Sequence, residues 1–252
     1  MRVILFCGKS ESSNIVYSFL KEKYKLEGIV LDAPISKKLL LMRRVKKLGY
    51  LRVFLQVAFM KVIIPLLKLE SKKRRKELIA DLDINSLNDF DNILRPSSIN
   101  DKSVIEYVKS KTVDLIIVYG TRIIKKNILL DVGVPLINLH VGITPKYRGV
   151  HGGYWALVNK DKKHFGVTAH IVDPGIDTGS IISQRIISKS REDNFCTYPL
   201  LQLKEGLLCL EDAIDQIKDN KILILKNDLN SNLYFHPTIT SYLFNRLFNG
   251  VK

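Results

Sequence analysis

Short apolar runs alternate along this chain with segments whose apolar residues recur at helical spacing, and this alternation most constrains the fold. The first run, residues 3–7, ends at Gly8, and the serines of residues 10–13 then offer caps for an amphipathic helix. Later apolar runs occupy residues 26–31, 113–119, 136–139, 166–172 and 222–226, and helical patterns occupy residues 101–111, 151–159 and 199–221. Such alternation predicts an α/β fold with a mostly parallel sheet covered by helices on both faces.

The turn at Gly8 is a partial match to a dinucleotide-binding loop. The G-x-G-x-x-G fingerprint needs two further glycines, which are absent here, and only Asp32 stands near the place of its ribose-binding acid. We therefore do not expect an NAD site.

Size and composition describe a globular protein. The chain has 252 residues, of which 46% are hydrophobic and 26% charged, enough for one large domain or one domain with an appendage. Three cysteines without a C-x-x-C pair suggest neither a disulfide framework nor a zinc site, so no metal is expected and a reducing cytoplasm fits best. The apolar run at the N-terminus is too short for a signal peptide.

Positive charge is concentrated in residues 36–76. This segment holds fourteen basic residues and one acid, Glu70, so it carries +13 of the formal +15. It also contains a mostly apolar stretch, residues 51–69, in which three basic residues and Pro65 argue against a membrane span. Three interpretations stay open: a helical insertion packed on the domain, a basic amphipathic element on an anionic membrane, and a nucleic-acid contact, which the few aromatic residues disfavour.

Three polar residues follow the ends of apolar runs and carry the candidate chemistry. Asn138 and His140 are two apart, so they point to the same side of a strand, and Asp177 lies in the glycine-containing loop VDPGIDTG. Open α/β sheets bind ligands at the carboxyl ends of their strands. Together these side chains could supply an amide donor for a developing oxyanion, a titratable imidazole and a carboxylate that orients it.

The segments LINLHVGITPKYRGVHGGYWAL and HIVDPGIDTGSII resemble the folate-dependent formyltransferase family, which includes glycinamide ribonucleotide, methionyl-tRNA and sugar-nucleotide formyltransferases. The likeness covers residues 113–184 well and the first strand loosely. It implies a Rossmann-like formyltransferase fold, 10-formyltetrahydrofolate as the formyl donor, and Asn138, His140 and Asp177 as the catalytic residues.

The resemblance also implies binding residues around the trio. Gly120, Arg122 and Ile124 resemble the pterin-binding loop, with Asp173 and Gly175 on the other side of the folate ring. Beside the cleft, the predicted substrate-binding residues are Tyr147, Arg148 and His151; an exposed loop is the alternative for the first two. His170 fits a core residue or a supporting group equally well, and Trp155 fits the core better than a ligand platform.

The sequence departs from the family where Gly142, Ile143 and Thr144 replace a common Ser-Leu-Leu before Pro145, which puts the acceptor side in question. The chain also has no room for the C-terminal barrel of methionyl-tRNA formyltransferases. We expect one catalytic domain over residues 1–190, with a basic insertion at about 36–80, and a C-terminal helix and extension over residues 191–252 packed on it.

The preferred acceptor is a nucleotide-linked amino sugar for surface polysaccharide (lipopolysaccharide) synthesis in the cytoplasm. Alternatives are glycinamide ribonucleotide as acceptor, hydrolysis of formyltetrahydrofolate, and a binding protein for membrane or nucleic acid that keeps the fold. A peripheral contact with anionic membrane would use residues 36–76. Nucleic acid is not expected as a partner, and the oligomeric state stays open, with a homodimer as one option.

Overall fold

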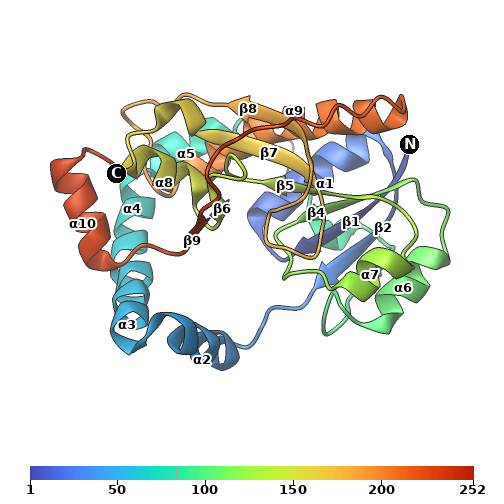
Figure 1. Ribbon diagram of the computed structural model, residues 1–252, viewed down its shortest axis with the longest axis horizontal. Helices are drawn as coiled ribbons and strands as arrows, with labels where there is room; N and C mark the ends of the chain where they lie inside the picture. Colours follow the sequence, from blue (N-terminus) through green and yellow to red (C-terminus); the bar gives the residue numbers. More distant parts are fainter. Residues whose placement is uncertain (83) are drawn as a thin grey trace.

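A seven-stranded sheet forms the centre of the computed structural model, which describes residues 1–82 and 84–252 (Figure 1). Its spatial order is β3-β2-β1-β4-β5-β7-β8; the first five strands are parallel, β7 runs antiparallel to β5, and β8 runs antiparallel to β7. The mostly parallel sheet predicted from the sequence is thus confirmed. The strands are β1 (Arg2–Gly8), β2 (Lys25–Asp32), β3 (Ile93–Leu94), β4 (Leu115–Tyr119), β5 (Leu136–His140), β7 (Gly166–Ile171) and β8 (Ile181–Ile186).

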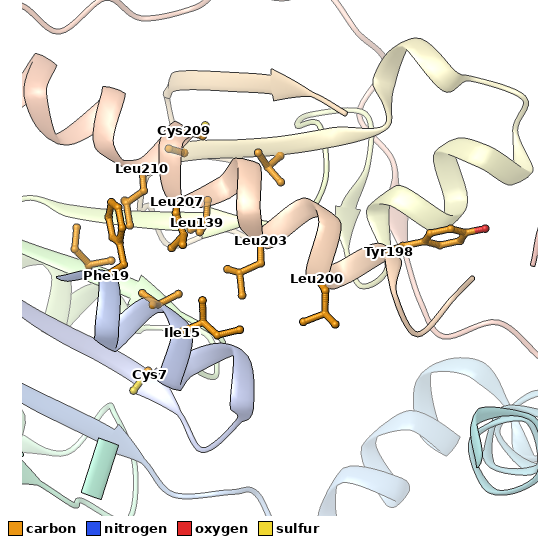
Figure 2. Packing of buried hydrophobic residues seen from close by; sticks show 14 of the residues in the cluster. Cys7, Ile15, Phe19, Leu139, Tyr198, Leu200, Leu203, Leu207, Cys209 and Leu210 are labelled. Carbon is orange, nitrogen blue, oxygen red and sulfur yellow. The ribbon is translucent and has the colours of Figure 1, made fainter. Parts of the chain in front are cut away.

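Helices cover both faces of this sheet, because alternate strand residues point to opposite sides. Leu5 and Leu139 pack with α1 (Glu11–Lys23) and α9 (Tyr198–Lys218), whereas Phe6 and Val118 pack with α6 (Lys102–Lys109) and α7 (Lys126–Asp131). Figure 2 shows α9 directing leucines toward α1 and the sheet. Helices on both faces were predicted, and α9 makes the C-terminal part of the chain continuous with the main core.

The first strand and helix meet at a tight turn beside the carboxyl edge of the sheet. A Cβ atom on Gly8 would lie 2.5 Å from the carbonyl oxygen of Gly120, so only glycine allows the ends of β1 and β4 to approach this closely. Ser10 then caps α1 by accepting a hydrogen bond from the Ser13 backbone N–H at 3.0 Å, as the sequence predicts.

The basic segment folds as helices beside the sheet, seen at the left and bottom of Figure 1. They are α2 (Lys37–Leu48), α3 (Tyr50–Ala58), the π-turn η1 (Phe59–Ile63), α4 (Ile64–Glu70) and α5 (Lys72–Ile79). The helical insertion is confirmed, but Pro65 does not end the helix as expected. It lies in the first turn of α4, directly after the wider turns of η1, where the missing N–H is tolerated. We call residues 50–70 the rod.

The C-terminal segment differs from expectation in two places. The strand predicted from residue 222 is wrong: only Leu225 pairs, through a single bridge to Ile181, and Ile222, Leu223 and Ile224 are exposed. An apolar run alone does not make a strand when no sheet edge or core face receives it. Conversely, the tail forms an unpredicted helix, α10 (Ile239–Phe248), which packs along α3 and η1 (Figure 1).

Short elements complete the fold. Strand β6 (Arg148–Gly149) pairs in parallel with β9 (Leu233–Tyr234), and this pairing joins the loop after β5 to the tail. The remaining elements are α8 (Gly152–Val158) and the 3-10 turns η2 (Leu87–Asp89) and η3 (Lys162–His164).

Candidate active site

A cavity of about 510 Å³ opens at the carboxyl ends of β4 and β5. Its lining includes all three predicted catalytic residues and all five predicted cofactor-binding residues. The predicted residues in the lining are Gly120, Arg122, Ile124, Asn138, His140, Asp173, Gly175 and Asp177.

Strand β5 places Asn138 and His140 on the same side, and the neighbouring strand β7 places His170 directly opposite Asn138. The Nδ1 of His170 lies 2.7 Å from the carbonyl oxygen of Ile171, which can only accept a hydrogen bond. Nδ1 therefore carries the proton, and Nε2 accepts from the Asn138 amide at 3.1 Å. His170 thus orients Asn138, which resolves its two sequence-based interpretations in favour of a supporting group.

Both ring nitrogens of the buried His140 face polar groups. Nε2 lies 2.8 Å from the carbonyl oxygen of Tyr147 and donates to it, so Nδ1 is the nitrogen that faces Asp177, with its Oδ2 at 3.4 Å. Burial lowers the pKa of His140, and the charge of Asp177 opposes that effect. The resting imidazole is neutral, with a lone pair on Nδ1 that can accept a proton.

Asp177 is held as a carboxylate in a left-handed backbone conformation, with φ of 51°. Its Oδ2 accepts the Gly149 N–H at 2.9 Å, and its Oδ1 lies 3.4 Å from the Asn138 amide. Burial raises the pKa of Asp177, but the positive charge that His140 and His170 carry when protonated, together with the hydrogen bond from the Gly149 N–H, lowers it to about 2. Strained backbone at a non-glycine residue is often found at functional sites.

Asp32, which was not among the predicted site residues, holds the loop after β4 in place. Arg122 donates from both its backbone N–H and its Nε to Asp32, each at 3.0 Å, and Asp32 also accepts the Ile99 N–H at 2.9 Å. The acid considered for a ribose contact instead holds the predicted pterin loop. Its position at the end of β2, beside the carboxyl edge, was the signal in the sequence.

The opposite wall of the cavity is the loop of residues 173–178, which is held by hydrogen bonds within itself. Asp173 accepts hydrogen bonds from the Thr178 hydroxyl at 2.7 Å and from the Gly175 N–H at 3.1 Å. These bonds fix the loop that carries Asp177, so the two walls of the cavity are each braced by a carboxylate.

A family model described as formyl transferase matches residues 57–197, more than half of the chain. The chain belongs to the formyl transferase family. This confirms the resemblance drawn from the sequence.

Sequence relatives of this family member include methionyl-tRNA formyltransferases. The protein from Thermodesulfovibrio yellowstonii is 39% identical over 128 residues, which cover 50% of this chain and 41% of that protein. The protein from Caldanaerobacter subterraneus is 29% identical over 151 residues, covering 59% and 48%. The chain thus spans less than half the length of these curated relatives.

Solved structures with the same fold include formyltransferases named for other acceptors. A sugar N-formyltransferase from Shewanella sp. FDAARGOS_354 superposes with a TM-score of 0.57 at 12% identity, covering 93% of this chain and 76% of that one. Glycinamide ribonucleotide transformylase 1 from Symbiobacterium toebii superposes with a TM-score of 0.58 at 16% identity, covering 93% and 94%. At such identities the likeness confirms the Rossmann-like formyltransferase fold.

The three predicted substrate-binding residues do not line the cavity. Tyr147 is buried, donating from its hydroxyl to Asp161 at 2.9 Å, and Arg148 donates to the Ile176 carbonyl at 3.0 Å. His151 lies 2.9 Å from His236, and burial lowers its pKa to about 3. These side chains brace the loops around the site, and their contact with substrate stays a prediction.

Trp155 packs against the core, as expected, and donates from Nε1 to the Phe235 carbonyl at 2.9 Å. The three cysteines are free thiols, and burial raises the pKa of Cys7 to about 12. Within residues 1–82 and 84–252, no group of three or more His, Cys, Asp or Glu side chains is arranged to hold a metal ion.

Proposed function

We propose that this chain transfers a formyl group from 10-formyltetrahydrofolate to a primary amine. The observation that carries this proposal is the cluster of Asn138, His140 and Asp177 in one cavity, with a neutral imidazole facing an ionised carboxylate. At about 510 Å³, the cavity is within the usual range for small-molecule sites.

The folate supplies an activated formyl carbon when it is bound. His140 Nδ1 takes the proton that the attacking amine loses, and Asp177 stabilises the resulting imidazolium. The Asn138 amide, oriented by His170, donates to the oxygen on which negative charge develops. The amine nitrogen would bond to the formyl carbon, the bond from that carbon to the folate nitrogen would break, and the departing nitrogen would take the proton from Nδ1 of His140. Nε2–H stays engaged by the Tyr147 carbonyl, so Nδ1 both accepts and returns the proton.

The donor would lie between the two braced walls. The loop of Gly120, Arg122 and Ile124 presents backbone groups on one side, and Asp173 and Gly175 stand on the other. Because Asp32 engages the Arg122 side chain, this arginine serves to hold the loop in place.

As acceptor we propose a nucleotide-linked amino sugar, used in surface polysaccharide synthesis in the cytoplasm. A second hollow of about 340 Å³ also has Asp177 in its lining, so two substrates could meet there. Its lining offers the ammonium of Lys226 and the amide of Asn227, which suit phosphate and sugar hydroxyls.

Methionyl-tRNA is the second candidate acceptor. The relatives that carry this name are up to 39% identical over the matched segments, and the +13 charge of residues 36–76 would attract RNA. Glycinamide ribonucleotide and water are the remaining acceptors to compare.

These proposals are tested by following the absorbance change that accompanies the release of tetrahydrofolate from 10-formyltetrahydrofolate. The panel contains amino-sugar nucleotides, glycinamide ribonucleotide, methionyl-tRNA and no acceptor. Release that depends on one amino-sugar nucleotide supports the preferred acceptor. Release with methionyl-tRNA alone would make methionyl-tRNA the acceptor instead. Release without any acceptor indicates a hydrolase, and absence of folate binding would contradict the donor assignment.

A further inference from the structure

The rod is the one helix among the described residues that is long and apolar enough to cross a membrane by length and composition. One of its faces, however, is packed on the domain. Val53, Phe59 and Leu67 are buried, and the Phe59 ring meets the Phe195 ring edge-on with centroids 5.0 Å apart. Gln56 donates to the His236 carbonyl at 2.6 Å. Crossing a bilayer would break these contacts, so the rod lies against the domain along its length.

The outer face of the rod is apolar and exposed. Its large side chains recur every three to eight residues, in steps that fit one face of a helix. Leu51, Leu69 and Phe54 are 73%, 73% and 69% exposed. The outer face consists of Leu51, Phe54, Val62, Leu66 and Leu69.

Helix α10 adds a second exposed apolar stripe beside the rod. Its inner side chains, Tyr242 and Asn245, are buried, whereas the opposite side exposes Leu243, Phe244, Leu247 and Phe248. The two helices are tied together where Arg246 donates to both carboxylate oxygens of Glu70, at 2.9 and 3.1 Å. The last helix and the rod are therefore in direct contact, with their exposed apolar stripes on neighbouring helices.

Basic residues surround and interrupt these stripes. Arg52, Lys61 and Lys68 are exposed on the rod, and α2, which buries no residue, adds six more cations. Glu70, the single acid of residues 36–76, is already paired with Arg246. Of the fourteen basic residues in that segment, eleven have no carboxylate within 4.0 Å among the described residues.

We propose that the rod and α10 form a docking face for an anionic lipid bilayer, on which the rod lies in the plane of the surface. A bilayer offers hydrocarbon for the leucines and phenylalanines and acidic headgroups for the lysines and arginines at the same depth. Nucleic acid offers phosphates and base faces for phenylalanine rings, but no hydrocarbon for the leucines and valine that make up most of the rod's outer face. A second copy of this chain would bring the same positive charges, which repel. The charge of the face therefore selects the lipid.

Vesicle flotation of the full chain tests the docking face. Vesicles of phosphatidylcholine alone are compared with vesicles that contain about one third phosphatidylglycerol, at low and at high salt. We expect binding to the anionic vesicles only, and weaker binding as salt rises. No binding to the anionic vesicles would overturn the proposal.

Two variants assign the binding to this face. Phe54→Ser, Val62→Ser and Leu66→Ser together should lower partitioning on the order of a hundredfold, because each loses apolar burial in the bilayer. Replacing Lys61 and Lys68 by glutamine should lower it by about fivefold for each lysine. The matched control, Leu130→Ser, Ile186→Ser and Leu223→Ser together, removes three similarly exposed apolar side chains from α7, β8 and residues 221–230. Equal loss in the control would overturn the assignment.

Other partners give distinct results in the same samples. A dimer in light scattering that the triple variant abolishes would replace the lipid with a second copy. A gel shift with RNA that depends on the lysines, in a chain that ignores vesicles, would replace it with nucleic acid. Formyl transfer is measured without vesicles, so a chain that floats but does not transfer contradicts only the proposed function, and the reverse result contradicts only the docking face.

Discussion

The active-site cavity and the outer face of the rod differ in whether their polar side chains find partners within the chain. In the cavity, Asn138, His140 and Asp177 are partly or wholly buried, and each has a partner supplied by this chain. On the rod, large apolar side chains are exposed, and its cations Arg52, Lys61 and Lys68 have no carboxylate within 4.0 Å among the described residues. The first region is organised by its own fold. The second requires something outside the chain to bury it.

The largest loss of activity is expected from substitutions of the catalytic trio in the cavity. His140→Ala removes the proton acceptor and should lower kcat/KM by about a hundredfold to a thousandfold, with similar losses for Asn138→Ala and Asp177→Ala. Folate binding and the melting temperature should stay close to those of the wild type. Tetrahydrofolate release and calorimetry check both.

His164→Ala is the matched control, because His164 pairs with Asp161 at 2.8 Å outside the cavity lining. It should keep full activity. Normal turnover in the three site variants would remove the cluster from the mechanism altogether.

Two neighbouring leucines test the two faces of the rod. Leu67 is buried and Leu66 is exposed, so Leu67→Ala should lower the free energy of unfolding by about 2–5 kcal/mol while Leu66→Ala changes it by less than about 0.5 kcal/mol. Chemical denaturation without lipid measures both. Equal losses would mean that the rod is buried all round, and no loss in either would mean that it is not packed on the domain.

The sequence predicted the parts of the molecule whose structure depends on the local pattern of apolar and polar residues. Short continuous apolar runs predicted the central strands, which are buried on both faces, and the motif around Asn138 and His140 predicted the trio. It did not predict His170 as the partner of Asn138, because that contact depends on the antiparallel register of β5 and β7. Helix α10 was not predicted because this short helix is stabilised by packing of its Tyr242 and Asn245 face against α3 and η1, which are far away in the sequence.

Asp32 offers a smaller effect on the cavity. Asp32→Asn keeps the shape of the side chain but removes the charge that holds Arg122, so the donor loop should loosen. We expect the KM for 10-formyltetrahydrofolate to rise by about tenfold with kcat within about twofold of the wild type. Steady-state kinetics at fixed acceptor measure the split. A fall in kcat with unchanged KM would instead give Asp32 a role in the chemical step.

The smallest effect is a displacement of the pH profile. His140 must be neutral to accept the amine's proton, and burial lowers its pKa while Asp177, whose pKa is about 2, stays ionised and limits that decrease. Activity should therefore persist below the usual histidine pKa of about 6.5 and fall only at more acidic pH. The pH dependence of kcat/KM, with an acceptor whose own amine titration is known, measures this limb. An acid limb above that usual value would mean that His140 rests protonated, and that Asp177 outweighs burial in the cavity.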